Sequence, residues 1–399
     1  MPRSLWLLVI GMIINVTGAS FLWPLNTIYI HDELGKSLTV AGVILMLNAG
    51  ASVIGNLAGG VLFDKIGGYR SILLGIIITL AALIGMIFFH GWPHYVILLT
   101  IVGFGSGIVF PATYALAGSV WPEGGRKSFN AIYVAQNAGV AIGSALGGLV
   151  ASISFQWIFM ANGLLYVLFF LVAFFGYRNI QGQTIHPTAL VTKKPGMKDR
   201  TKFTALSILS IAYLLCWVAY VQWQSTIAAH TQTLNIDLKQ YSLLWTINGL
   251  MIVLGQPLLS AFVKRFAKTL KSQMLIGMGI FMVSFVIAAT AGGFSGFLTA
   301  MIILTIGEML VWPAVPTIAN DLAPKGREGF YQGFVNSTAT AGRMVGPLLG
   351  GILVDLYNMP VMFAVLIGLL VISFFITMIY DRNIKYLSNQ DLSAETVKG

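Results

Sequence analysis

The chain has 399 residues, of which 57% are hydrophobic and 9% are charged, and its formal net charge is +10. Soluble globular domains are about half apolar and about a quarter charged, so this composition excludes a soluble domain and predicts a membrane protein with many spans. The single cysteine, Cys216, excludes an internal disulfide and a cysteine-rich metal site.

Apolar segments of about 20 residues, the length that crosses a bilayer as a helix, recur along the chain. The first has the basic start and apolar run of a secretory signal, but it is longer and lacks a convincing cleavage site, which predicts a retained helix. Six spans are expected near residues 1–27, 40–62, 71–89, 95–119, 129–152 and 157–177. Six more are expected near 203–227, 241–262, 273–291, 297–320, 330–354 and 361–380.

The longest polar stretch separates these two groups of spans. It covers residues 178–202 and contains His186-Pro187 and Lys193-Lys194-Pro195-Gly196, a composition typical of a solvated linker. The predicted domains are an N-terminal six-helix bundle over 1–177, a cytoplasmic linker over 178–202, and a C-terminal six-helix bundle over 203–399 with a short cytoplasmic tail. The predicted fold class is an all-α polytopic membrane protein with two pseudo-symmetric bundles.

Basic residues are distributed unevenly between the predicted loops. With the N-terminus in the cytoplasm, all but three of the 23 Lys and Arg residues fall on the cytoplasmic side; the exceptions are Lys36, Lys239 and Arg343. Positive charge accumulates on the inner side of membrane proteins, so both termini are expected in the cytoplasm beneath the plasma membrane. Topology and anionic lipid thus account for the net charge, and no nucleic-acid partner is expected.

The two halves also share a spacing of residues. The Pro111 region, followed by Arg126 and Gly143, aligns with Pro313 and the residues that follow it, at an offset of about half the chain. Internal repeats of this size are how secondary transporters are built, with a binding site near the bilayer midplane.

The loop between the second and third spans contains a recognisable motif. It reads Gly60-Val-Leu-Phe-Asp64-Lys65-Ile-Gly67-Gly68-Tyr-Arg70. It resembles the cytoplasmic loop signature of the major facilitator superfamily. The resemblance implies a conformational latch formed by Gly60, Asp64, Lys65, Gly67 and Arg70, which tunes the inward/outward equilibrium without contacting substrate. An ordinary polar turn is the alternative reading.

Glycines four residues apart occur in spans five and eleven. Span five has Gly143 and Gly147, and span eleven has Gly346, Pro347 and Gly350. Both resemble the glycine-rich antiporter motif of the drug/proton branch of that superfamily, although span five has Ser144 in place of proline. Small residues at this spacing let helices pack closely, so simple packing and coupling-related bending near Pro347 both stay open.

Span ten carries an acid inside an otherwise uncharged run. Glu308 is about 16 Å from Phe297, and Arg343 is about 20 Å from Phe330, at about 1.5 Å per residue, so both are expected near mid-depth. A charge at that depth is costly and is a functional candidate. The region resembles the tenth span of multidrug exporters that use a carboxylate for proton coupling. We expect Glu308 to exchange a proton, with Arg343 as its partner in one state; a static ion pair is the alternative.

Aromatic and uncharged polar residues of several spans are expected to line a substrate cavity. Such a cavity with one acid suits large apolar or cationic compounds through stacking and cation–π contacts. Each residue alone is more often a packing residue. The set is Asn26, Tyr114, Tyr133, Gln136, Trp217, Tyr220, Gln224, Trp245, Asn248, Trp312 and Asn336.

The predicted function is proton-coupled export of hydrophobic or cationic drug-like compounds by alternating access. A transporter of one metabolite, such as a sugar or peptide, is the second possibility, and a membrane sensor the third. No catalytic or metal-ligand spacing occurs among the histidines, so an enzyme, a metal and a cofactor are not expected. The expected partners are a small-molecule substrate, protons and the lipid bilayer, and the expected state is a monomer.

Overall fold

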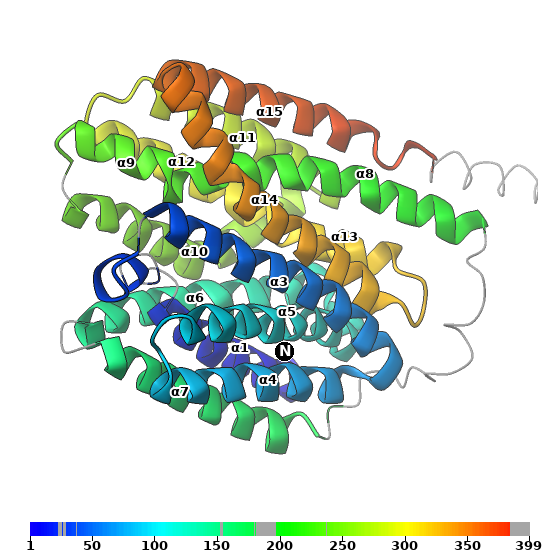
Figure 1. Ribbon diagram of the computed structural model, residues 1–399. Helices are drawn as coiled ribbons and strands as arrows, with labels where there is room; N and C mark the ends of the chain where they lie inside the picture. Colours follow the sequence, from blue (N-terminus) through cyan, green and yellow to red (C-terminus); the bar gives the residue numbers. More distant parts are fainter. Residues whose placement is uncertain are drawn as a thin grey trace, which may run out of the picture. The chain divides into compact units, whose positions relative to one another are not determined.

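The computed structural model describes residues 1–22, 26, 29–36, 38–151, 155–178, 180, 197–236 and 238–383. Throughout these residues the regular structure is helical, as Figure 1 shows. Most of the predicted linker and the predicted C-terminal tail lie outside them. The helices group into two compact units.

Unit 1 comprises Met1–Val191 with Gly249–Gly255 and Lys325–Met344. Two short π-helices, η1 (Tyr29–Glu33) and η3 (Val172–Gly176), and one 3-10 helix, η2 (Pro122–Gly124), accompany its long helices. The long helices are α1 (Arg3–Leu22), α3 (Leu38–Ile66), α4 (Gly68–Phe88), α5 (His94–Val120), α6 (Arg126–Ala151) and α7 (Phe155–Leu171).

Unit 2 comprises Thr192–Asn248, Gln256–Pro324 and Val345–Gly399. Two helices, α10 (Leu238–Phe266) and α14 (Glu328–Leu356), contribute residues to both units. The others are α8 (Met197–Tyr220), η4 (Val221–Gln224), α9 (Thr226–Thr233), α11 (Leu270–Ala289), α12 (Phe294–Val311), α13 (Ala314–Leu322) and α15 (Met359–Ile379). The domain boundaries expected from the sequence stay a prediction.

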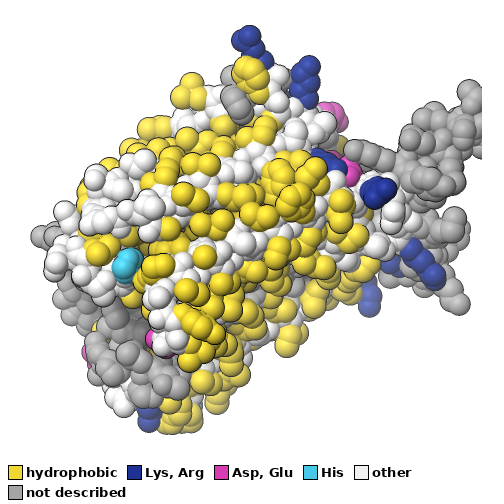
Figure 2. All heavy atoms as spheres, turned by 90° about the horizontal axis from the view of Figure 1, so that it is seen from above, with side chains coloured by type: hydrophobic (Ala, Val, Ile, Leu, Met, Phe, Trp, Pro, Cys, Tyr) yellow, Lys and Arg dark blue, Asp and Glu magenta, His cyan; other side chains and the backbone are white. Residues whose placement is uncertain are grey.

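Ten stretches in the described part of the chain are long and apolar enough to cross a membrane. They cover every predicted span except the fifth and eighth, which correspond to α6 and α10. Many large apolar side chains are exposed on these helices and on α10, including Leu356, Phe375 and Leu258, at 70%, 60% and 78%. In Figure 2 hydrophobic side chains dominate the face drawn and Lys and Arg stand at its margins, as expected where lipid is the solvent.

Two predicted spans are interrupted. The span expected over 297–320 is divided into α12 and α13 at Trp312-Pro313, and the span expected over 203–227 is divided into α8, the 3-10 helix η4 and α9. Pro313 and Pro316 have no N–H to donate, so regular hydrogen bonding cannot run through the first break. The second break contains no proline, and the sequence gives no comparable signal for it.

Glycine sets the close approach of α3 and α5 in unit 1. A Cβ atom added to Gly107 would lie 2.5 Å from the Ser52 carbonyl oxygen and 3.1 Å from the Gly55 Cα. A Cβ atom at Gly59 would lie 2.5 Å from the carbonyl oxygen of Ile108. These are backbone atoms, which cannot turn aside, so the two helices depend on bare glycine at the contact.

Replacement of Gly107 therefore tests this packing. We expect Gly107→Ala to lower the midpoint of thermal unfolding of the purified protein, because overpacking costs about 1–3 kcal/mol. The matched control is Gly279→Ala in α11, where an added Cβ meets nothing within 4 Å. That control should leave the midpoint unchanged or raise it, because alanine favours a helix over glycine by about 0.5–1 kcal/mol. Equal midpoints for the two variants would contradict the packing argument.

Candidate functional site

Glu308 lies in the last turn of α12, immediately before the break at Trp312-Pro313. Its backbone carbonyl accepts a hydrogen bond from the Trp312 N–H at 3.0 Å, the last of the regular bonds in that helix. The Glu308 side chain is only 3% exposed. The acid predicted from the sequence is thus buried and does not face lipid.

Two donors from other helices bind one oxygen of this carboxylate. The Tyr220 hydroxyl of α8 donates to Glu308 Oε2 at 3.0 Å, and the Asn248 amide of α10 donates to the same oxygen at 2.8 Å. Asn248 Nδ2 also lies 2.9 Å from Thr305 Oγ1, one turn before Glu308 on α12. Three helices therefore meet at one acid, and hydrogen bonds to a carboxylate are stronger than those between neutral groups.

Aromatic rings of α8, α11 and the helix break gather around Tyr220, whose hydroxyl binds this acid. Trp217 and Trp312 stack with centroids 4.5 Å apart and planes 9° apart. Tyr220 meets both rings edge-on, at 5.4 Å and 5.3 Å. Tyr213 and Phe281 each approach Trp312 to 5.5 Å. We call Tyr213, Trp217, Tyr220, Phe281 and Trp312 the aromatic cluster.

Five residues predicted for the cavity bind Glu308 or lie in ring contact with Tyr220, which binds it: Asn248 and Tyr220, and Trp217, Trp245 and Trp312. The Trp245 ring lies 6.3 Å from that of Tyr220, and its indole donates to the Tyr241 hydroxyl at 3.0 Å. Gln224 lies nearby in the chain, half-buried in η4. The Glu308 carboxylate, which can bind a proton, therefore lies beside aromatic rings on which a planar molecule can stack.

The other predicted cavity residues belong to unit 1 and form separate contacts. Asn26 accepts a hydrogen bond from the Tyr95 hydroxyl at 2.8 Å, and the Tyr114 hydroxyl donates to Gln136 at 3.0 Å. Tyr133 is buried, and the Asn336 amide donates to the Gln332 carbonyl one turn earlier at 2.9 Å. A shared cavity that includes these residues stays a prediction.

Arg343, the predicted partner of the acid, donates from Nη2 to Thr340 Oγ1 at 3.2 Å in the first part of α14. It belongs to unit 1, whereas Glu308 belongs to unit 2. The pairing of Arg343 with Glu308 therefore stays a prediction.

Sequence reasoning did not include four residues of this region among the site residues. Thr305 lies three positions before Glu308 on the same helix face, a spacing that could have identified it. Tyr213 is one turn from Trp217, and its spacing from Trp217 and Tyr220 does place it on the same helix face, although it was not counted among the site residues. Phe281 of α11 and Gln222 of η4 carry no local signal, because their positions depend on how distant helices pack.

The predicted latch residue Asp64 binds the first turn of α14 within unit 1. Its two carboxylate oxygens accept from the backbone N–H groups of Gly329 and Phe330, each at 2.8 Å. The backbones approach closely here, since a Cβ on Gly60 would lie 2.3 Å from the Gly329 carbonyl oxygen. A carboxylate at a helix N-terminus satisfies free N–H groups and complements the helix dipole.

The remaining latch residues shape or flank this contact. Gly67 ends α3 with a φ of 84°, in the left-handed region where glycine is favoured. Lys65 and Arg70 are exposed on either side of it.

The predicted packing glycines also meet neighbouring helices. A Cβ on Gly143 would lie 2.4 Å from the Thr17 carbonyl oxygen of α1, and one on Gly346 would lie 2.3 Å from Val221. Gly350 faces Gln222, with Pro347 between the two glycines inside α14. Gly147 lies within α6, and its surroundings are not among those that the structure describes.

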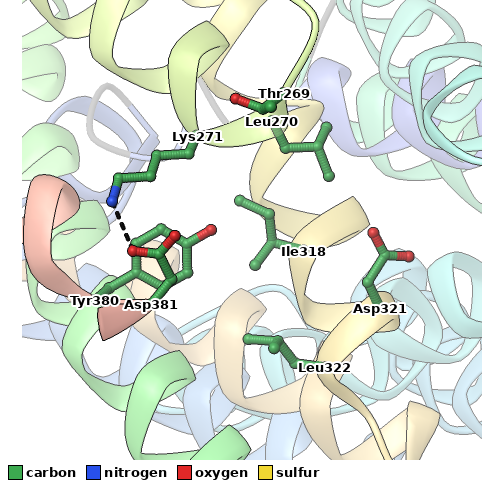
Figure 3. A pocket seen from close by; sticks show the side chains of 8 residues that line it. All are labelled: Thr269, Leu270, Lys271, Ile318, Asp321, Leu322, Tyr380 and Asp381. Atoms are coloured by element: carbon green, nitrogen blue, oxygen red, sulfur yellow. Dashed lines mark hydrogen bonds and ion pairs between the residues drawn. The ribbon is translucent and has the colours of Figure 1, made fainter. Parts of the chain in front are cut away.

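A second polar region lies where α11 begins and α13 and α15 end. It is a pocket of about 270 Å³ in unit 2, shown in Figure 3. Its lining residues are Thr269, Leu270, Lys271, Ile318, Asp321, Leu322, Tyr380 and Asp381.

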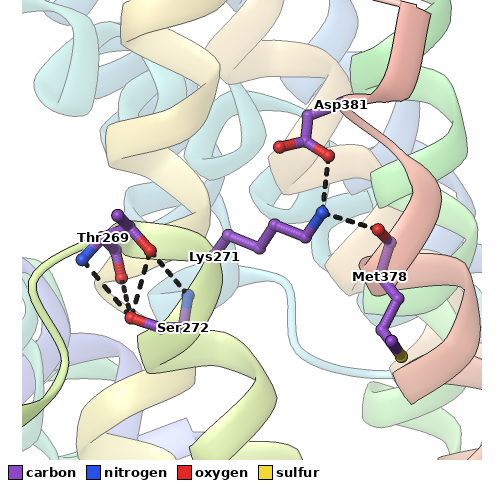
Figure 4. Close-up of polar contacts among 5 residues, drawn as sticks. All are labelled: Thr269, Lys271, Ser272, Met378 and Asp381. Carbon is purple, nitrogen blue, oxygen red and sulfur yellow. Dashed lines mark hydrogen bonds and ion pairs between the residues drawn. The ribbon is translucent and has the colours of Figure 1, made fainter. Parts of the chain in front are cut away.

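Lys271 holds this end of the helices together. Its ammonium lies 2.6 Å from Asp381 and donates to the Met378 carbonyl at 2.5 Å, as drawn in Figure 4. Thr269 and Ser272 cap the start of α11 reciprocally. Capping and ion pairing account for the pocket's polar groups apart from Asp321 and the Tyr380 hydroxyl, and the pocket includes no predicted site residue, so we assign it a structural role.

The family model of the Major Facilitator Superfamily matches residues 8–230 and 206–394. The chain belongs to the major facilitator superfamily. It is 66% identical over 385 residues to the uncharacterised MFS-type transporter YttB of Bacillus subtilis (strain 168), covering 96% of this chain and 97% of YttB. This member is therefore a multi-pass membrane transporter of small molecules and not an enzyme.

More distant similarities agree with that assignment. The chain is 24% identical over 400 residues to the quinolone resistance protein NorA of Staphylococcus aureus (strain MRSA252), covering 98% of this chain and 100% of NorA. The human organic anion transporter MFSD10 (TETRAN) has the same fold, with a TM-score of 0.76 at 14% identity over 94% of this chain and 100% of that one. A bacterial homologue of the iron transporter ferroportin gives 0.78 at 14%, over 96% and 100%.

Asp64 can be tested by removing its charge while keeping its shape. In Asp64→Asn one oxygen becomes an NH₂ group that faces a backbone donor, so we expect about 1–3 kcal/mol of lost stability and a lower thermal midpoint. The control is Asp355→Asn, an exposed acid near the C-terminal end of α14, whose loss should not lower the midpoint. An unchanged midpoint in Asp64→Asn would show that the two hydrogen bonds contribute nothing.

Proposed function

We propose that this transporter exports hydrophobic or cationic drug-like compounds in exchange for protons, with Glu308 as the proton carrier. The observation that carries the proposal is the geometry around Glu308: a buried carboxylate bound by Tyr220 and Asn248, beside the stacked rings of Trp217 and Trp312. A buried acid of this kind in a membrane helix is a functional-site candidate by default.

The aromatic cluster supports a flat, apolar or cationic substrate. Tryptophan offers a large face for stacking and for cation–π attraction. The Trp312 indole N–H is buried, and no described residue accepts a hydrogen bond from it. A substrate with an acceptor oxygen would satisfy that donor. The name of the relative NorA, quinolone resistance protein, supports a drug-like substrate.

The proposed mechanism is alternating access. A proton on Glu308 neutralises the site and weakens its attraction for a cation, so proton binding and substrate binding oppose each other. Arg343 is proposed to stabilise the ionised form of Glu308 in one state. The Asp64 contact with the first turn of α14 is proposed to hold one state until the site changes occupancy.

The proposed setting follows the distribution of basic residues. Both termini lie on the cytoplasmic side of the plasma membrane, and the working unit is the monomer. Substrate moves outward while protons move inward.

The experiment that tests this proposal is dye transport in everted membrane vesicles with an imposed pH gradient. A planar aromatic cation should accumulate in vesicles with the wild-type protein, and Glu308→Gln should reduce gradient-driven accumulation to the level of vesicles without the transporter. Glu308→Asp should retain part of it, because it keeps a titratable group. The control is Glu123→Gln in η2, an exposed acid whose loss should leave accumulation unchanged.

Two results would contradict the proposal. Undiminished gradient-driven accumulation in Glu308→Gln would exclude the carrier role. Wild-type accumulation of the dye that ignores the gradient would favour a facilitative transporter of one metabolite or a sensor.

The stacking surface gives a separate prediction for binding. Trp217→Leu should weaken binding of the planar cation about 2- to 30-fold at fixed pH, because an aromatic or cation–π contact contributes about 0.5–2 kcal/mol. Dye polarisation with the purified protein gives the dissociation constant. Trp6→Leu in α1, where the ring is 54% exposed, is the control and should bind as wild type. A dissociation constant unaffected by Trp217→Leu would remove the aromatic cluster from the substrate site.

A further inference from the structure

The break between α8 and α9 contains a fully buried amide. Gln222 lies in η4 at 0% exposure, between Tyr220 at the end of α8 and Thr226 at the start of α9. A buried amide without partners costs about 1–3 kcal/mol. Its surroundings therefore need to supply donors and acceptors.

Gln222 finds partners on three helices. Its Nε2 donates to the Val218 carbonyl of α8 at 3.1 Å and to the Gly346 carbonyl of α14 at 2.6 Å. Its Oε1 accepts from the Thr226 hydroxyl of α9 at 2.8 Å. The side chain thus joins both sides of the break to α14.

Helix α14 meets this segment through glycines. A Cβ on Gly350 would lie 2.0 Å from Gln222 Oε1 and 2.6 Å from Thr226 Oγ1. Gly346 faces Val218 and Val221 in the same way. Pro347, between them, has no N–H, so one hydrogen bond is missing from α14 at the contact, and proline kinks helices where it interrupts them.

The segment that contains Gln222 also contacts Glu308, through Tyr220. Tyr220 lies two residues before Gln222, and its hydroxyl donates to Glu308 at 3.0 Å. A hydroxyl binds a carboxylate more strongly than it binds a neutral acid, so a proton on Glu308 weakens the bond that holds the end of α8. The end of α8 is then held less tightly, and this change reaches the segment from Gln222 to Thr226, which contacts α14.

Other titratable groups of unit 2 lie beside the partners of this acid or at the ends of the helices packed against α12. From α10, Tyr241 acts on Tyr220, and its own hydroxyl donates to the Trp223 carbonyl. Helices α11 and α13 also pack against α12, but their charged residues Lys271 and Asp321 line the pocket of Figure 3 at the helix ends.

We propose that the segment from Tyr220 to Thr226 couples the proton on Glu308 to the bend of α14 at Gly346–Pro347, with Gln222 as the positioning residue. This rests on the proposed function only in taking Glu308 as a group that gains and loses a proton. Gln222 contacts neither proton nor substrate. It sets which angle of α14 accompanies each state of the acid.

The test follows the angle of α14 through the distance between its end and α8. Spin labels are placed at Ile211→Cys on α8 and Leu356→Cys at the end of α14, positions 55% and 70% exposed, in a Cys216→Ala background. Pulsed electron resonance gives the distance between labels at mildly acidic and mildly alkaline pH in lipid nanodiscs. We expect the wild-type distance to shift with pH and Glu308→Gln to hold the acidic value at both.

Two substitutions then break the coupling from opposite sides. Gln222→Met removes the amide, and Gly350→Ala places a methyl group where Gln222 Oε1 lies. Each should reduce the pH-dependent shift to less than half while the protein elutes as a folded, monodisperse species. Gly351→Ala is the matched control, because a Cβ there meets nothing within 4 Å, and it should keep the full shift.

The outcomes separate this proposal from proton-coupled export. A full shift in Gly350→Ala or in a folded Gln222→Met overturns it, and so does a wild-type distance that ignores pH. If vesicle transport ignores the gradient while the wild-type distance shifts and Gly350→Ala abolishes the shift, the coupling stands and only proton-driven export fails.

Discussion

The pair of hydrogen bonds on Glu308 Oε2 is the interaction on which the arrangement of unit 2 depends. Tyr220 and Asn248 bring α8 and α10 to the end of α12, and both donors are almost fully buried. A buried acid without such donors would be strongly destabilising. The aromatic cluster packs beside this contact, so the acid, the break in α12 and the stacked tryptophans lie together.

The two helix breaks have a common consequence. Where α12 stops at Trp312-Pro313, Trp312 is placed against Trp217; where α8 stops at Tyr220, the chain turns through η4 and presents Gln222 to α14. Irregular backbone within a membrane protein is tolerated only where neighbouring groups satisfy it. Both breaks in unit 2 lie close to Glu308, and both are filled by buried side chains.

Much of this could be predicted from the sequence. Apolar length predicted the helices, and the cost of a charge at mid-depth identified Glu308. Trp217 and Tyr220 were both among the predicted cavity residues, and they share a helix face because they lie three apart in one span. The partners across helices could not be found in this way: nothing near Phe281 or Gln222 in the sequence indicates which helix each will meet. The break in α8 was missed for a related reason, since a buried amide and the Thr226 hydroxyl replace the proline that usually marks such a break.

The contact of Asp64 with α14 joins residues 265 positions apart in the chain. At a synthesis rate of about 5–20 residues per second, the ribosome needs about 13–53 s to reach Gly329 after Asp64 has been made. During this interval the carboxylate has no helix end to cap, so water or lipid headgroups must solvate it at the membrane surface. The contact can therefore form only after most of the chain has been synthesised.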